Sequence, residues 1–245
     1  MYYSAGTYEA FAHPEKPKDV DNKSAYIIGT GLAGLTAAFY LVRDGQMNGE
    51  HIHLLEKLEL AGGSCDGRKD ITKGFFMRGG REMDNHFEVM WDTFRDVPSI
   101  ETPGISVLDE YYWLNKHDPN YSLCRASINC GEDAHTDKQF KLDKDSALAL
   151  SKLFMTPEKD LEDMTIEDYF GKDSEFFHSS LWWCYHSMLA FKPYHSALEA
   201  QRYFNRFGLL NRLDYLEGIL HTKRNDKDSV IKPIHKWLEN QGVTF

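Results

Sequence analysis

The hydrophobic pattern near the start of the chain predicts a strand, a helix and a second strand. Residues 25–28 form a short apolar run, and residues 51–56 have the pattern of a second strand. The helix between them should run to about Asp44 and stop at Gly45, since glycine ends helices readily. A strand, a helix and a second strand in this order form a βαβ unit with a right-handed crossover. We therefore expect a parallel sheet in this part of the fold.

Three glycines at the first strand–helix junction have the G-x-G-x-x-G spacing of a dinucleotide-binding turn: Gly29, Gly31 and Gly34. Gly29 permits the tight turn, Gly31 lets backbone N–H groups approach a pyrophosphate, and Gly34 lets the helix pack close to the strand. The phosphates would then lie at the helix N-terminus, beside Leu32 and Ala33, where unpaired N–H groups and the helix dipole favour an anion.

An acidic residue follows the second predicted strand. Glu56 lies about 20 residues past the glycines, where a carboxylate can accept hydrogen bonds from ribose hydroxyls. Gly62, Gly63 and Ser64 come soon after it. This resembles flavoproteins related to glutathione reductase and the amine oxidases, in which a glycine pair after the acid lies along FAD. We therefore predict FAD in preference to NAD. An ordinary glycine turn with a surface acid and a simple loop is the alternative.

A second informative stretch covers residues 73–87. An apolar run enters a glycine pair flanked by arginines, in the order Arg78, Gly79, Gly80, Arg81 and then Glu82. Adjacent glycines allow backbone conformations closed to other residues and a close approach to a flat ring. Paired arginines can hold phosphate or orient carboxylates. The alternative is a turn followed by a charged helix N-terminus.

The rest of the chain is predicted to be largely helical. A strand is expected over 107–114 and a hairpin within 118–138. Helices are expected over 146–154, from Pro157 with Thr156 as N-cap, from the capping box Thr165–Asp168, over 196–207 and over 228–239. Residues 243–245 should begin a strand. An aromatic stripe over 175–191 is more typical of a core than of a pocket wall.

These elements together predict an α/β fold, a Rossmann-like FAD-binding parallel sheet of the glutathione-reductase type with an inserted helical region. The expected parts are an N-terminal arm over 1–23, the first part of the FAD-binding domain over 24–145, a helical substrate or lid region over 146–227 and a return to the FAD-binding domain over 228–245. Because such a domain normally needs further strands, we expect the fold to be truncated.

Charge and composition narrow the function. The formal net charge of −10 argues against a nucleic-acid surface and gives no help in attracting anionic lipid. No apolar run approaches bilayer-spanning length, and the N-terminus lacks the apolar core of a signal peptide. The four cysteines have no metal-type spacing, so we predict no metal site and a reducing, cytoplasmic environment.

Several longer motifs carry a resemblance to a known family. They are Met1-Tyr2-Tyr3-Ser4, Tyr8-Glu9-Ala10-Phe11, Arg78-Gly79-Gly80-Arg81-Glu82-Met83, Ser106-Val107-Leu108-Asp109-Glu110, Asp118-Pro119-Asn120-Tyr121-Ser122, Ile166-Glu167-Asp168-Tyr169-Phe170 and His195-Ser196-Ala197-Leu198-Glu199. In these motifs the chain resembles the oleate hydratases, also called the myosin-cross-reactive antigen family. The resemblance runs from end to end of the chain and covers the amino-terminal part of the family's length.

The resemblance implies a reaction and its residues. Oleate hydratases add water to the cis double bond of an unsaturated fatty acid, giving a 10-hydroxy acid, and use FAD without net redox change. By resemblance, the segment 78–83 closes on the flavin, Glu82 orients or activates water, and Tyr203 protonates the alkene. The implied partners are the fatty acid, a second copy of the protein and, peripherally, a membrane surface.

The chemistry sets a physical requirement. Glu82 as a carboxylate can deprotonate water, but a tyrosine with a pKa of about 10 is a weak acid for an alkene. Developing positive charge must therefore be stabilised by preorganised groups, for which Glu82 and an electron-rich flavin are candidates. Two alternatives stay open. One is a flavin-dependent oxidoreductase of the amine-oxidase or carotenoid-desaturase type, and the other is an inactive lipid-binding fragment.

Overall fold

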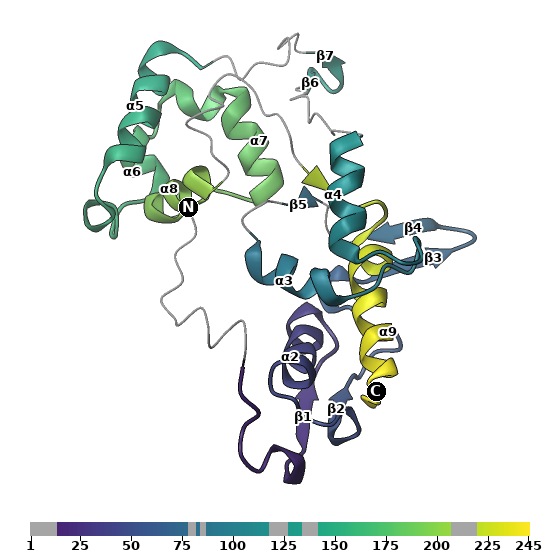
Figure 1. The fold of residues 1–245 in the computed structure, drawn as a ribbon. Helices are drawn as coiled ribbons and strands as arrows, with labels where there is room; N and C mark the ends of the chain where they lie inside the picture. Colours follow the sequence, from purple (N-terminus) through teal and green to yellow (C-terminus); the bar gives the residue numbers. More distant parts are fainter. Residues whose placement is uncertain (1–13, 78–81, 84–86, 118–126, 134–141, 207–219) are drawn as a thin grey trace. The chain divides into compact units, whose positions relative to one another are not determined.

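The computed structural model describes residues 14–77, 82–83, 87–117, 127–133, 142–206 and 220–245 (Figure 1). The chain divides into two compact units. Unit 1 comprises Met1–Pro119 and Leu220–Phe245, and unit 2 comprises Asn120–Ile219. Each unit has a hydrophobic core of its own. The described elements form a mixed α/β structure that contains a small parallel sheet.

Unit 1 contains the predicted βαβ unit. Strand β1 (Ala25–Ile28) leads through α2 (Leu32–Arg43) to β2 (Ile52–Leu55). The two strands pair in parallel, with Ala25 opposite Ile52 and Ile28 opposite Leu55. This confirms the parallel sheet that the sequence predicted.

The end of the chain lies beside β2. The N–H of Leu54 donates to the Thr244 carbonyl over 2.9 Å, and the N–H of Thr244 donates to the Ile52 carbonyl over 3.1 Å. Thr244 therefore forms an isolated parallel bridge with His53. The expectation that 243–245 begin a strand is confirmed at this bridge, which adds a third position to the sheet next to β2.

Two helices cover one face of this sheet. Helix α9 (Lys232–Asn240), preceded by a π-helical turn over Lys227–Ile231, packs against α2, and the rings of Phe39 and Trp237 lie 4.7 Å apart (Figure 1). Together, buried residues of both helices and of β2 form the core of unit 1. On the opposite face, Tyr26 and Ile28 of β1 are 68% and 90% exposed. Among the described residues, the sheet is thus apolar on both faces but covered by helices on one.

The prediction of a strand over 107–114 was wrong, because this segment forms helix α4 (Val107–His117). Ser106 and Asp109 cap its first turn. The Asp109 N–H donates to the Ser106 hydroxyl oxygen over 3.0 Å, and the Ser106 hydroxyl donates to the Asp109 carboxylate over 2.8 Å. The buried side chains, Val107 and Tyr111, lie one helical turn apart. Asp109 between them is exposed, whereas a strand would place all three on one face. Helix α3 (Glu88–Asp96) packs beside α4.

Antiparallel pairs complete unit 1. Strands β3 (Gly67–Asp70) and β4 (Gly74–Met77) form a hairpin (Figure 1). Strand β5 (Glu82–Met83) pairs with β8 (Leu220–His221), with Glu82 opposite His221. Segments that are far apart in the chain therefore meet at Glu82.

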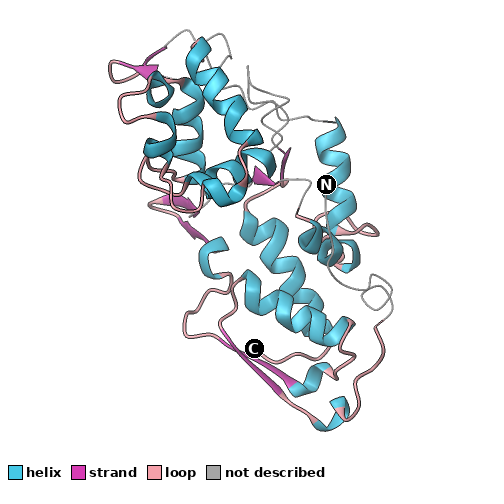
Figure 2. Cartoon of the chain, turned by 90° about the vertical axis from the view of Figure 1, so that its left-hand side faces the viewer, coloured by secondary structure: helices cyan, strands magenta, loops and turns pink. Residues whose placement is uncertain are grey.

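Unit 2 is a helical unit with a short hairpin. Strands β6 (Ser127–Ile128) and β7 (Glu132–Asp133) form the hairpin, which confirms the one expected within 118–138. The helices are α5 (Lys144–Met155), α6 (Ile166–Phe170), α7 (Ser180–Leu189) and α8 (Ala197–Arg206). They are labelled in Figure 1, and Figure 2 draws the described helices in cyan. The predicted capping box of Thr165 and Asp168 is present at the start of α6.

The helix predicted from Pro157 is reduced to a single 3₁₀ turn over Glu158–Asp160. Thr156, expected to be its N-cap, instead caps the C-terminus of α5. Its N–H donates to the Leu153 carbonyl, and its hydroxyl donates to the Lys152 carbonyl over 2.8 Å. The hydroxyl is thus used to end one helix rather than to start another.

The aromatic stripe over 175–191 forms the core of unit 2, as expected. Phe176, Trp182 and Tyr185 are buried. The rings of Phe170 and Phe176 stack at 3.8 Å. These side chains hold the helices of unit 2 together.

Candidate functional site

The best-defined candidate site lies where β1 turns into α2. Gly29 has a φ of +94°, a conformation open to glycine at little cost. Its N–H donates to the Leu55 carbonyl over 2.7 Å. The next residue, Thr30, donates to one carboxylate oxygen of Glu56, from its N–H over 3.0 Å and from its hydroxyl over 2.7 Å. The glycine turn and the predicted ribose-binding acid are therefore adjacent.

The Glu56 carboxylate is strongly favoured in its ionised form. Its other oxygen accepts a hydrogen bond from the N–H of Leu58 over 2.9 Å. The hydrogen bonds from Leu58 first, and then from Thr30, lower the pKa of Glu56 from 4.5 to about 2. The side chain is exposed to solvent. Glu56 is thus an ionised acceptor at neutral pH that can still be reached by a hydroxyl donor.

Two glycines in this region allow close backbone approaches. A Cβ atom on Gly34 would lie 2.1 Å from the carbonyl oxygen of Gly29, so only glycine lets α2 pack this close to β1. A Cβ atom on Gly63 would lie 3.1 Å from the Cα atom of Gly31. The N–H of Gly62 donates to the Thr30 carbonyl over 2.9 Å, and Gly31 and Gly62 form a parallel bridge. The structure therefore brings both predicted glycine groups together.

The first turn of α2 presents backbone donors at the same place. Gly31 is the N-cap and provides no side-chain cap. The first hydrogen bond of the helix runs from the Leu35 N–H to the Gly31 carbonyl. The N–H groups of Leu32, Ala33 and Gly34 therefore have no acceptor within the helix. Such donors, together with the helix dipole, suit a phosphate. Backbone donors, glycines that leave room beside them and an ionised acceptor fit the parts of a dinucleotide.

The other predicted cofactor residues are placed less fully. Ser64 is the exposed residue of a 3₁₀ turn over Gly63–Cys65, which begins at the second glycine of the pair. Arg78, Gly79, Gly80 and Arg81 lie outside the described residues.

The two predicted catalytic residues belong to different units. Glu82 is in β5 of unit 1, at the register position opposite His221. Tyr203 is in α8 of unit 2, where its side chain is 43% exposed. Its ring is perpendicular to the Phe191 ring, and the two centroids lie 5.5 Å apart. Their roles stay predictions.

A groove of about 440 Å³ starts at Ala61, next to the second glycine pair, and follows α9. Its volume is within the range of ligand pockets. Three lysines line it, but two are already engaged, since Lys227 donates to the Gly67 carbonyl over 2.7 Å and Lys232 pairs with Asp228. Glu239 also lines the groove, so its charge is mixed and it is not a defined subsite.

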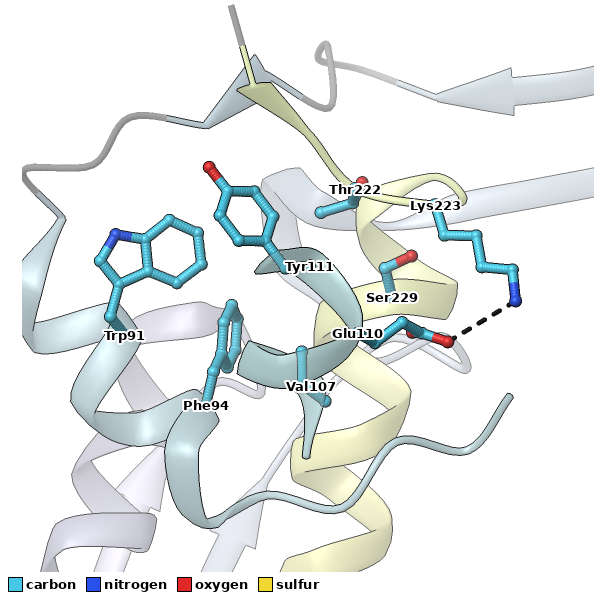
Figure 3. Close-up of a pocket in the computed structure, with 8 residues that line it drawn as sticks. All are labelled: Trp91, Phe94, Val107, Glu110, Tyr111, Thr222, Lys223 and Ser229. Carbon is cyan, nitrogen blue, oxygen red and sulfur yellow. Dashed lines mark ion pairs between the residues drawn. The ribbon is translucent and has the colours of Figure 1, made fainter. Parts of the chain in front are cut away.

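A second cavity lies between α3, α4 and the segment that follows β8 (Figure 3). Trp91, Tyr111 and Thr222 are among its lining residues, and Lys223 pairs with Glu110 across 3.6 Å at its edge. Its volume of about 10 Å³ corresponds to one water molecule. It is too small for a fatty acid.

Comparison with known proteins places the chain in a family. The model of the MCRA family matches residues 22–245. The chain belongs to the MCRA family. The chain is 51% identical over 246 residues to an oleate hydratase from Streptococcus pyogenes serotype M49 (strain NZ131). The match covers 99% of the chain and 41% of that relative. The family resemblance seen in the sequence motifs is thus confirmed.

A second relative of this MCRA family chain is a linoleate hydratase from Lactiplantibacillus plantarum. It is 28% identical over 245 residues, which cover 90% of the chain and 42% of the relative. The chain therefore spans about two fifths of the length of the curated relatives it matches. Across the described ranges, every helix falls short of the length and apolarity that a bilayer-spanning segment needs.

Two features of the site were not predicted from the sequence. Thr30 stands between Gly29 and Gly31, at a position where the glycine motif specifies no residue type. Its hydroxyl group was the only sign in the sequence that it could donate a hydrogen bond. His221 stands in a segment with no motif, and its place opposite Glu82 depends on a long-range strand pairing.

Proposed function

We propose that this chain carries the cofactor-binding and catalytic residues of an FAD-dependent fatty acid hydratase. The enzyme would add water to the cis-9 double bond of oleate-like acids and give 10-hydroxy acids. The observation that carries this proposal is the 51% identity over 99% of the chain to a protein named oleate hydratase. The geometry of the glycine turn supports the cofactor.

The proposed FAD site uses the groups gathered around Thr30. Leu32, Ala33 and Gly34 offer N–H groups to the phosphates, and Glu56 accepts from ribose hydroxyls. Gly62, Gly63 and Ser64 would lie along the cofactor, and the segment 78–83 would close on the flavin. When bound, FAD would supply an electron-rich ring near developing positive charge.

The surrounding fold supports the same assignment. We propose that the parallel strands, with Thr244 beside β2, belong to a Rossmann-like FAD-binding domain formed by 24–145 and 228–245, with 146–227 as a substrate or lid region. Doubly wound sheets carry helices on both faces, and the exposed apolar face at Tyr26 and Ile28 fits such a second layer.

The proposed reaction needs a base and an acid from this chain. Glu82, as a carboxylate, takes a proton from water while the water oxygen bonds to one alkene carbon. Tyr203 gives a proton to the other carbon, so one C–O and one C–H bond replace the double bond. The proton taken by Glu82 balances the one given by Tyr203, and nothing is oxidised or reduced. The half-exposed Tyr203 side chain is compatible with access to substrate.

Location and assembly follow as further parts of the proposal. The protein would act in the cytoplasm as a homodimer, with peripheral contact to the membrane that holds its substrate.

Isotope labelling tests the proposed reaction. Flavin-loaded protein is incubated with oleate in ¹⁸O-labelled water, and the product is analysed by mass spectrometry. We expect label in a 10-hydroxy acid. A new double bond or a peroxide would instead indicate a flavin-dependent oxidoreductase, and purified protein with no flavin spectrum and no product would indicate a lipid-binding role.

Variants test the base. Glu82→Gln should keep the flavin spectrum and lower the hydration rate by about 10²-fold or more, the usual contribution of a general base. Glu59→Gln is the matched control, because Glu59 is an exposed glutamate on the loop after β2 with no assigned role. Unchanged turnover in Glu82→Gln would remove Glu82 from the mechanism.

A further inference from the structure

The pairing of β5 with β8 singles out His221. In this antiparallel pair Glu82 is directly opposite His221, and Met83 is opposite Leu220. Directly opposed positions in antiparallel strands share one face of the ribbon. His221 and the proposed catalytic Glu82 therefore occupy facing register positions.

Asn115 of α4 determines which kind of strand pair this is. Its side-chain oxygen accepts from the His221 N–H over 3.0 Å, and its side-chain nitrogen donates to the His221 carbonyl over 2.9 Å. The N–H and the carbonyl of one strand residue point to the same edge, so both point away from β5. Glu82 and His221 thus form a non-hydrogen-bonded pair, the kind in which Cα atoms approach to about 4.5 Å and side-chain positions are closest.

The structure also determines the tautomer of His221. Its Nδ1 atom lies 2.9 Å from the Thr222 carbonyl oxygen, which can only accept. Nδ1 therefore carries a hydrogen, and Nε2 holds the lone pair in the neutral ring. The ring is buried, with 6% of the residue exposed. The contact between Nδ1 and the Thr222 carbonyl therefore identifies Nε2 as the nitrogen that can take up a proton.

We propose that His221 is a positioning residue for Glu82, whose carboxylate it holds in place and in the ionised form through a proton on Nε2. This inference rests on the proposed role of Glu82 as the base for water. Protonated Nε2 would donate to the carboxylate, and a positive ring beside a carboxylate favours the ionised form. The two hydrogen bonds from the Asn115 side chain to the His221 backbone hold β8, and with it the His221 ring, in register with β5.

Other charged groups around His221 have partners of their own. From α4, Glu110 pairs with Lys223 over 3.6 Å, and the Tyr111 ring contacts Trp91 at 4.2 Å. After β8, Arg224 pairs with Glu101 over 2.8 Å. From β5, the opposed titratable residue is Glu82. Lys223 is therefore a suitable control, since it is a nearby cation with a different carboxylate as its partner.

NMR on the chain itself tests the inference without any turnover. Long-range ¹H–¹⁵N spectra of histidine-labelled protein should show His221 protonated at Nδ1 in the neutral form. In protein with ¹³C-labelled glutamate, the Glu82 carboxyl signal is assigned by its loss in Glu82→Gln. In His221→Gln its titration midpoint should rise by about one pH unit, because an opposite charge within 4–6 Å lowers a carboxyl pKa by one unit or more.

Lys223→Gln provides the comparison and should leave the Glu82 midpoint unchanged within the fitting error. An unchanged midpoint in His221→Gln, or an equal shift in Lys223→Gln, would overturn the inference. If His221→Gln does not fold, the wild-type titration decides, because a Glu82 midpoint at or above the ordinary glutamate value of about 4.3 would also overturn the inference.

Activity then separates this inference from the proposed function. In a protein that hydrates oleate, the acid limb of the kcat/KM profile should move upward by the same pH interval in His221→Gln and should not move in Lys223→Gln. If no hydration occurs but the NMR midpoint moves, the proposed function fails and the pairing stands. If hydration occurs and neither midpoint nor acid limb moves, only the role of His221 fails.

Discussion

Thr30 donates two hydrogen bonds to a single oxygen of Glu56, from its N–H over 3.0 Å and from its hydroxyl over 2.7 Å. This contact ties the turn after β1 to the residue after β2. It also orients the carboxylate that would accept from a ribose. The two strands are thus linked at the point where a dinucleotide would bind.

The first prediction concerns the pKa of Glu56. Thr30→Val removes the hydroxyl donor but keeps the backbone donor and the hydrogen bond from Leu58. We expect the pKa of Glu56 to rise from about 2 toward its ordinary value of 4.5, as measured by ¹³C NMR titration. Thr36→Val is the control, since the Thr36 hydroxyl donates within α2 to the Leu32 carbonyl. An unchanged Glu56 titration in Thr30→Val would refute the contact.

The same pKa makes stability depend on pH. A carboxyl whose pKa is depressed in the folded state stabilises the protein above its unfolded pKa and loses this contribution as the pH falls through the folded value. The contribution of Glu56 should therefore be complete above about pH 4.5 and fade toward pH 2. Urea midpoints of wild type and Glu56→Gln should differ at pH 6 and converge near pH 2. A constant difference would contradict the assignment.

The second prediction separates two glycines of one motif. Gly34→Ala would place a Cβ atom 2.1 Å from the Gly29 carbonyl oxygen, so α2 must move away from β1. We expect a loss of about 3 kcal/mol or more in unfolding free energy. Gly31→Ala meets its nearest atom at 3.7 Å, an ordinary contact. It should fold with a change of about 0.5 kcal/mol or less.

For FAD binding, the informative variant is Gly31→Ala, because it should keep its fold. Gly31→Ala adds a methyl group where the backbone would approach the phosphates, so FAD affinity should fall at least about tenfold in this folded variant. Fluorescence titration measures the affinity, and circular dichroism confirms the fold. Wild-type affinity in Gly31→Ala would place the cofactor elsewhere.

The third prediction concerns Arg43, which joins α2 to α3. Its guanidinium lies 2.6 Å from Asp92 and 2.7 Å from Asp96, and it also pairs with Asp44. Burial lowers the pKa of Arg43, but the hydrogen bonds that its guanidinium donates to Asp44, Asp92 and Asp96 raise it overall. Arg43→Met would leave the mostly buried Asp92 without this partner, so we expect a loss of about 2 kcal/mol in urea unfolding.

Arg202→Met is the matched control in unit 2. Arg202 pairs with Glu158 over 2.7 Å, but both side chains are at least half exposed. Exposed pairs contribute little, so the unfolding midpoint should not change measurably. Equal losses in the two variants would mean that burial of the Arg43 network has no energetic effect.

The fourth prediction concerns Tyr203. Because its side chain is half exposed, Tyr203→Phe should leave the thermal midpoint of the protein unchanged. If its hydroxyl protonates the alkene, hydration of oleate should fall by about 10²-fold. Tyr194→Phe, an exposed tyrosine before α8, should retain full activity. Equal hydration activity in Tyr203→Phe and Tyr194→Phe would show that the Tyr203 hydroxyl is not needed for the reaction.

Local spacing was enough to predict several elements. The glycines at 29, 31 and 34 predicted the turn from β1 into α2, and Thr165 with Asp168 predicted the capping box of α6. Both signals act within one or two turns of chain, so tertiary contacts had little chance to override them. The aromatic stripe likewise indicated the core of unit 2.

Local signals failed where one residue could serve two elements. The run of large residues after Ser106 suggested a strand, but the Ser106–Asp109 cap and the burial of Val107 and Tyr111 on one side stabilise a helix. Thr156 had the right position to start a helix, but the end of α5 takes its hydroxyl. Propensity was similar for both outcomes, and packing decided between them.

The sequence by itself determined the family, the βαβ unit and the glycine turn, because each depends on residue types at short, fixed spacings. Only the tertiary structure decided that Thr30 binds Glu56 and that His221 stands opposite Glu82. These contacts join segments that are distant in the chain. Their register is set by backbone pairing between strands, which no local pattern of residues encodes.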